Sequence, residues 1–210
     1  KKFEGTSSQE EFIRRTWLNL RSSDEGCTYA FEQLLLAKRV NALDAWRKAR
    51  SMVEIGRKPP ARDALHMVSG QSMAKLDELM ANPQRFLQQR AASMGKETPE
   101  WVALALIKLA ANDHQLALKQ MNTLKLVKSL NSEQLEWVWA VIARQAAMSF
   151  DPKAVVYFES TGLGQGLSDE LLAWKVRAAL RSEDGPRWPM VESAVQAMSP
   201  NAQKDPAWVY

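Results

Sequence analysis

Apolar residues recur at helical spacing along most of the chain. A helix is expected over residues 9–21, with an apolar face formed by Phe12, Ile13, Trp17 and Leu20. The same periodicity, bounded by glycine, proline or capping residues, predicts further helices at residues 28–37, 41–55, 61–68, 73–80 and 82–94. No segment alternates polar and apolar residues as a half-buried strand would. The pattern therefore predicts an all-α fold.

The C-terminal half carries a repeat that is marked by tryptophan. Four of these residues are spaced 36, 37 and 34 positions apart: Trp101, Trp137, Trp174 and Trp208. Each lies just inside an expected helix, and a shorter amphipathic stretch follows the first three, at residues 115–126, 152–158 and 188–198. Such spacing is typical of stacked helical hairpins. In an array of this kind the rings pack between hairpins, so we expect Trp137 and Trp174 to be buried.

Capping residues recur together with the tryptophans, which argues against an accidental spacing. Thr98-Pro99 places an oxygen-bearing cap before a proline at the first helical position. Asn131 and Ser168 precede first turns that carry carboxylates, which the positive end of the helix dipole favours. One turn after each of the first three rings stands a small or compact residue: Ala105, Val141 and Ala178. A large ring followed by a small residue lets the next helix approach closely.

Together these features predict an all-α superhelical array of helical hairpins, a tetratricopeptide-like α-solenoid with about 34–37 residues per repeat. We expect an N-terminal helical segment at residues 1–97 and tryptophan-marked repeats at residues 98–210, which together form one continuous superhelix. The chain stops at Tyr210 in the first turn of a capped helix, so we expect a truncation there. An array of this kind favours an extended binding surface over a closed reaction centre.

Composition and charge narrow the range of partners. The 210 residues are 46% hydrophobic and 25% charged, as is ordinary for a globular protein, and no run of 18 apolar residues predicts a membrane span. The net charge of +4 comes from residues 1–100, which carry 17 basic and 13 acidic side chains against 11 of each in residues 101–210. Its densest group is Arg47, Lys48, Arg50, Arg57, Lys58 and Arg62. Such a group either attracts an anionic polymer or is an ordinary solvated helix face.

Few residues suggest chemistry. His66 and His114 have no metal-ligand spacing, and the single Cys27 leaves no partner for an internal disulfide or a cysteine-based zinc site. Residues 162–166 read Gly-Leu-Gly-Gln-Gly, but they follow an expected helix instead of a strand and lack the Gly-Lys-Ser/Thr ending of a phosphate loop, so we expect an inter-repeat loop. The sequence thus assigns no catalytic, cofactor-binding or metal-binding residue, and the substrate-binding residues stay unknown.

Several segments resemble a known family. Residues 168–181, Ser-Asp-Glu-Leu-Leu-Ala-Trp-Lys-Val-Arg-Ala-Ala-Leu-Arg, and residues 205–210, Asp-Pro-Ala-Trp-Val-Tyr, are similar to the superhelical domain of soluble lytic murein transglycosylases. Upstream, the helix with Trp17-Leu18 and the pair Gly26-Cys27 resemble the family's Trp-Leu helix and its Gly-Cys pair. The stretch between these two motifs is shorter here than in the family, and an earlier cysteine of the relatives is absent.

The resemblance implies a ring of helical hairpins that carries a separate lysozyme-like catalytic domain. Enzymes of this family are lyases that cleave the bond between N-acetylmuramic acid and N-acetylglucosamine in the periplasm, with one catalytic glutamate in a Glu-Ser pair. The residues just before Ala146-Ala147 resemble the family's approach to this pair, but two alanines stand in its place. Glu159-Ser160 is a Glu-Ser pair, but it lacks the Gly-Leu-Met-Gln element of the family. We therefore expect a non-catalytic part of a peptidoglycan-cleaving protein of murein turnover in the cell wall, which either positions murein glycan strands or scaffolds the catalytic domain.

By this resemblance the expected partners are peptidoglycan glycan strands and cell-wall proteins, with no cofactor, no nucleic acid and no membrane span. The expected location is the periplasm, although the first residues, Lys-Lys-Phe-Glu, hold no apolar signal core. The alternative is a tetratricopeptide-type scaffold for peptides, which needs polar residues at matched concave positions. A helical-repeat RNA binder would need base-reading side chains once per repeat, where this chain carries aromatic or small residues.

Overall fold

The structure is a computed structural model, and it describes residues 6–164 and 166–206. Its regular elements are all helices, and no strand occurs in these residues, so the predicted all-α class is confirmed. The chain divides into two compact units, which we call the N-terminal unit, Lys1–Glu97, and the C-terminal unit, Thr98–Tyr210. Each is described by itself.

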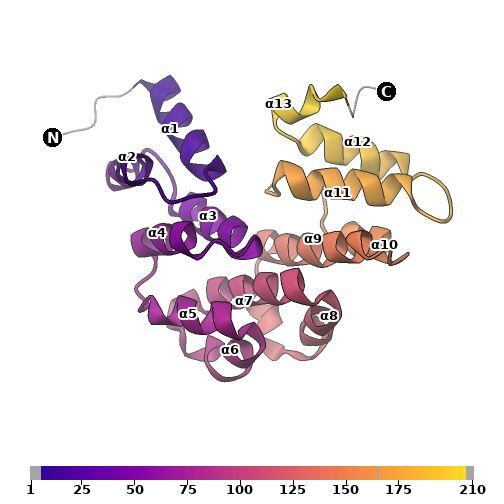
Figure 1. The fold of residues 1–210 in the computed structure, drawn as a ribbon, viewed down its shortest axis with the longest axis horizontal. Coiled ribbons are helices and arrows are strands. Elements are labelled where there is room, and N and C mark those ends of the chain that lie inside the picture. Colours follow the sequence, from indigo (N-terminus) through magenta and orange to yellow (C-terminus); the bar gives the residue numbers. More distant parts are fainter. Residues whose placement is uncertain (1–5, 165, 207–210) are drawn as a thin grey trace. The chain divides into compact units, whose positions relative to one another are not determined.

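The N-terminal unit is built from pairs of helices. Its α-helices are α1 (Ser7–Asn19), α2 (Glu25–Leu36), α3 (Ala42–Glu54), α4 (Lys58–Val68), α5 (Ala74–Ala81) and α6 (Pro83–Gln89). Consecutive helices pack as α1 with α2, α3 with α4 and α5 with α6, and α1 also contacts α3 (Figure 1). Trp17 of α1 stacks on Phe31 of α2 with ring centres 3.8 Å apart, and both side chains are buried.

Several helix boundaries in this unit differ from the predicted ones; α2, for example, begins at Glu25, three residues before the expected start. The helix expected at residues 61–68 begins earlier, at Lys58, because its two prolines fit the first turn, where no backbone N–H is needed. The helix expected to reach residue 94 ends at Gln89. Arg90 leaves the helical conformation, and its carbonyl accepts a hydrogen bond from the Ser93 hydroxyl at 2.7 Å, so the chain continues as short 3₁₀ turns.

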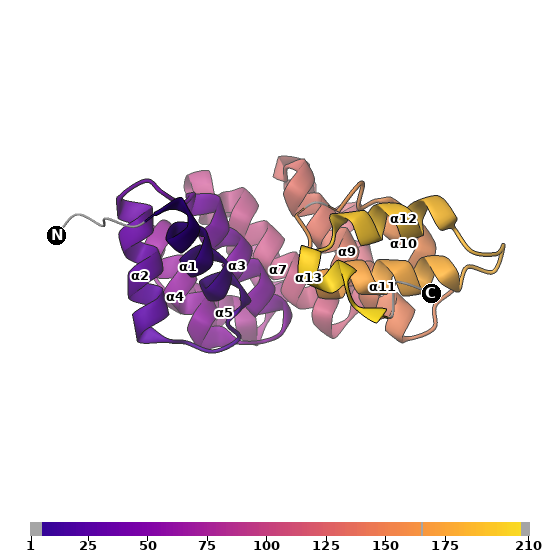
Figure 2. The same ribbon diagram turned by 90° about the horizontal axis from the view of Figure 1, so that it is seen from above.

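The C-terminal unit contains three further helix pairs. Its α-helices are α7 (Thr98–Asn112), α8 (His114–Thr123), α9 (Ser132–Met148), α10 (Ala154–Glu159), α11 (Asp169–Leu180), α12 (Trp188–Ala197) and the short α13 (Pro200–Gln203). Pairs form between α7 and α8 (Figure 1), and between α9 and α10 and α11 and α12 (Figure 2). The first helix of the middle pair, α9, packs on both α7 and α11, so the pairs are joined through their first helices.

Two of the predicted caps, Asn131 and Ser168, are observed, whereas Thr98 is itself the first residue of α7 and not its cap. The Asn131 side chain accepts a hydrogen bond from the Gln134 backbone N–H at 2.9 Å, and the Gln134 side chain accepts one from the Asn131 N–H, which makes a capping box. Ser168 caps α11 by accepting from the N–H of Leu171 at 3.3 Å. Each cap satisfies a backbone donor that the helix itself leaves unbonded.

The tryptophans of the repeat are not equally buried. Trp101 is fully buried and Trp137 is 3% exposed, as expected for rings that pack between helices. Trp174 is only half-buried, contrary to the prediction, and the Arg177 guanidinium lies 5.3 Å from its ring centre. The fourth ring, Trp208, lies outside the described residues. On α11 the next residue, Lys175, occupies the buried position instead.

Candidate functional site

The basic group of the N-terminal unit does not form one exposed patch. Lys48 and Arg50 are buried in α3, with 1% and 0% of their surface exposed. Lys58 and Arg62 share the carboxylate of Asp77, at 3.1 and 2.9 Å. The hypothesis that the six residues together attract an anionic polymer is therefore wrong, because burial and ion pairing already engage most of them.

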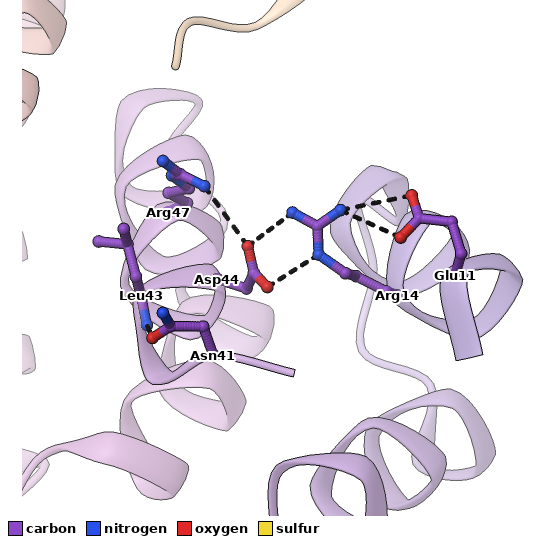
Figure 3. A network of polar contacts seen from close by, with 6 residues as sticks. All are labelled: Glu11, Arg14, Asn41, Leu43, Asp44 and Arg47. Carbon is purple, nitrogen blue, oxygen red and sulfur yellow. Dashed lines mark hydrogen bonds and ion pairs between the residues drawn. The ribbon is translucent and has the colours of Figure 1, made fainter. Parts of the chain in front are cut away.

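A network of charges joins α1 to α3 (Figure 3). The Arg14 guanidinium donates two hydrogen bonds of 2.8 Å to the two carboxylate oxygens of Asp44, and it also pairs with Glu11 at 3.4 Å. Arg47 lies 3.6 Å from the same Asp44 carboxylate. Burial of Asp44 by itself raises its pKa, but the hydrogen bonds from Arg14 and the charges of Arg14 and Arg47 outweigh it, so the pKa of Asp44 is lowered. The network fixes α1 against α3 and is structural.

Replacing Asp44 by asparagine is expected to destabilise the N-terminal unit by about 1–3 kcal/mol at pH 7, because the charge-assisted pair with Arg14 is lost. The pKa of Asp44 is lowered in the folded state, so its contribution is present above the unfolded pKa and is lost as the pH falls through the folded pKa. Urea unfolding at pH 7 and pH 3 measures the difference between the two proteins. An equal difference at both pH values would contradict the assigned role.

Lys48 is held inside the N-terminal unit and is not available to a ligand. Its Nζ donates to the carbonyl oxygens of Leu18, at 3.4 Å, and Leu20, at the end of α1, and it lies 5.6 Å from the ring centre of Trp17. Burial lowers the pKa of Lys48 to about 8. The side chain therefore closes the C-terminal end of α1, whose carbonyl groups lack partners within the helix.

The glycine segment at residues 162–166 is an inter-helix loop and not a phosphate cradle. The buried Lys175 donates to the Thr161 hydroxyl at 3.0 Å and to the Gly162 carbonyl at 2.7 Å, so its charge is used to hold the loop. The Glu136 carboxylate lies so close that a Cβ at Gly162 would come within 3.0 Å of its oxygen. A carboxylate this close to the loop would repel a phosphate bound there. Gln165 lies outside the described residues.

Glu159 has the surroundings of a surface residue. It is the last residue of α10, its side chain is 48% exposed, and it pairs with Arg187 at 3.6 Å. A general acid of a glycosidase needs an apolar pocket that raises its pKa. The position of Glu159 supplies no such pocket.

The histidines and the cysteine lie on three different helices. His66 is exposed on α4, and His114 at the start of α8 lies 3.9 Å from the Asp151 carboxylate. Cys27 is half-buried in the first turn of α2, where a hydrogen bond with the Asp24 carboxylate raises the pKa of the thiol. Across the described residues, no group of three or more histidine, cysteine, aspartate and glutamate side chains is placed to hold a metal ion.

One cleft of the C-terminal unit combines an exposed aromatic ring with charged groups. It has a volume of about 200 Å³ and lies between the α9–α10 turn, with Phe150 and Asp151, and the end of α11, with Arg181 and Glu183. Phe150 is 80% exposed, and the Arg181 guanidinium lies 5.5 Å from its ring centre. Sequence reasoning missed this cleft, which we call the Phe150 cleft. Its one local signal is an aromatic residue just after a helix end, where glycine is usual.

Comparison with known proteins assigns no family to the chain. No known protein-family model matches it. No curated protein sequence is significantly similar to it. The resemblance to lytic transglycosylases therefore stays a prediction from the motifs. Across the described residues, no helix is both long enough and apolar enough to cross a membrane.

Proposed function

We propose that this chain is a non-catalytic superhelical part of a lytic-transglycosylase-like protein of the periplasm, where it positions murein glycan strands for a catalytic domain. The observation that carries the proposal is the serial packing of helix pairs in the C-terminal unit. There α9 contacts both α7 and α11, and each of these first helices carries a repeat tryptophan. This supports a solenoid whose repeats are about 34–37 residues long.

Stacked helix pairs suit a long polymer better than a small substrate. Each pair buries its apolar faces against its neighbours and leaves its turns and outer faces in solvent, so the surface is extended and open. Trp101 and Trp137 serve this packing and are not free to bind a ligand. The buried Lys175 likewise serves to hold a loop. A strand would therefore contact the turns and helix ends.

Pull-down of the purified full chain on intact murein sacculi tests the proposal. We expect the protein to sediment with intact sacculi. When the glycan strands have been digested with a muramidase beforehand, the protein should stay in the supernatant. No anhydro-muropeptides should appear in the supernatant, because Glu159 has the surroundings of a surface residue. Release of these products that Glu159→Gln abolishes would contradict the non-catalytic assignment.

The same assay distinguishes the alternative scaffold for peptides. A panel of peptides and a single-stranded RNA are offered beside the sacculi at equal protein concentration. Binding of sacculi alone supports the proposal. Binding of a peptide or of RNA without binding of sacculi would contradict it and would favour an interaction scaffold of another class.

A further inference from the structure

We propose that the Phe150 cleft binds a sugar ring that carries a carboxylate, with the ring on Phe150 and the carboxylate on Arg181. The inference rests on the proposed function, because murein is a strand of amino sugars whose muramyl residues bear lactyl groups and acidic stem peptides. The inference specifies where on the chain the strand is held. Three features of the cleft carry it: the backbone at Phe150, the free charge of Arg181 and the size of the cleft.

Phe150 occupies a backbone position that normally belongs to glycine. Its φ is +57°, in the left-handed region. Its N–H donates to the Ala147 carbonyl at 3.2 Å, and the Asp151 N–H donates to the Ala146 carbonyl at 2.9 Å, which is the Schellman motif at the end of α9. A residue with a Cβ is strained in this conformation, and a bulky one is an outlier.

The end of α3 shows how the same motif is built without strain. There Gly56 has φ of +73°, its N–H donates to Val53 at 3.1 Å, and the Arg57 N–H donates to Met52 at 2.7 Å. Phe150 makes the same pair of bonds but gains no burial in return, since its ring is 80% exposed. The aromatic ring therefore gains no burial from folding at this position, whereas a ligand that stacks on it would cover it.

Arg181 brings an available positive charge to the ring. Its Nε donates to the Arg177 carbonyl at 3.3 Å, and its guanidinium lies over Phe150. Among the residues that the structure describes, this guanidinium pairs with no carboxylate. It can therefore take a ligand carboxylate through two parallel N–H···O bonds.

The acidic side chains of the cleft are compatible with a sugar. The Asp151 carboxylate already accepts from the Lys153 N–H at 2.9 Å and from the Gln115 amide at 3.4 Å. Glu183 lines the cleft and is an acceptor that sugar hydroxyls can donate to.

The size of the cleft fits one sugar ring of a strand. Its volume of about 200 Å³ is smaller than the roughly 300–1,000 Å³ of sites that enclose a whole small molecule. One face of a pyranose presents C–H groups that pack on an aromatic ring, while its substituents point outward. A ring stacked on Phe150 would thus hold its carboxylate toward Arg181 and continue as a strand on either side.

Calorimetric titration of the full chain with a soluble muramyl disaccharide-peptide tests the inference. Phe150→Gly is expected to weaken binding about tenfold or more, because the stacking surface is lost. The same change should leave the melting temperature unchanged or raise it, because glycine suits the left-handed backbone. Arg181→Gln should weaken the acidic ligand about tenfold or more but leave a neutral oligomer of N-acetylglucosamine little changed. Phe12→Ala is the matched control, since Phe12 is 70% exposed on α1.

The outcomes separate this inference from the proposed function. Normal binding of sacculi and of the disaccharide-peptide by Phe150→Gly would overturn the inference and leave the proposed function standing. Absence of sacculus binding by the unmodified chain would remove the proposed function, and the inference with it. Binding of the free stem peptide as tightly as the disaccharide-peptide, with the same sensitivity to Phe150→Gly, would also overturn the assignment of a sugar.

Discussion

Replacing Trp101 by alanine is expected to lower the free energy of unfolding of the C-terminal unit by about 3–5 kcal/mol. Trp101 is fully buried in α7, the helix that packs on both α8 and α9. Its loss removes a large apolar surface and leaves a cavity that the surrounding helices fill only in part. For a unit of this size the melting temperature should fall by roughly 10–25 °C, as followed by circular dichroism at 222 nm.

Trp188→Ala is the matched control for this change. Trp188 is 63% exposed at the start of α12, so its removal should change the free energy of unfolding by no more than about 0.5 kcal/mol. The half-buried Trp174 should give an intermediate loss. Equal losses for Trp101→Ala and Trp188→Ala would show that the rings of the repeat do not hold the helix pairs together.

Local signals explain why most helices could be predicted from the sequence. A cap such as Asn131 or Ser168 acts on N–H groups two or three residues away, so its effect is visible in a short segment. The tryptophan spacing likewise marks the first helix of each pair. Boundaries set by other contacts were missed, as at Gln89, where the chain passes into 3₁₀ turns.

The burial of charged residues could not be predicted, because it depends on partners far along the chain. Lys48 and Arg50 look like part of a basic surface until α3 is packed, and the carbonyl groups that receive Lys48 belong to Leu18 and Leu20 of α1. The Phe150 cleft is formed in the same way. Phe150 and Arg181 come from different helix pairs and meet only in the fold.

The buried Lys48 makes the stability of the N-terminal unit depend on pH in a way that can be isolated. Burial lowers its pKa from 10.5 to about 8 in the folded state. Below pH 8 both states carry the charge, and the folded state bears the full desolvation cost. Between pH 8 and 10.5 the folded state has released the proton while the unfolded state keeps it, so the free energy of unfolding rises with pH. Above 10.5 the gain is complete.

Lys48→Met removes the titrating amine but keeps a long side chain in the same space, so it serves as the reference. The stability of the unmodified protein relative to Lys48→Met is expected to rise by roughly 3 kcal/mol between pH 7.5 and 10.5. Urea unfolding of both proteins at several pH values in this range measures it, and the subtraction cancels every other group that titrates in both. Lys48→Met also leaves the Leu20 carbonyl without its donor. This lowers the stability of the variant by an amount that does not change with pH. A difference between the two proteins that stays flat with pH would show that folding leaves the pKa of Lys48 at its ordinary value, and that an ammonium group closes the end of α1 over most of this pH range.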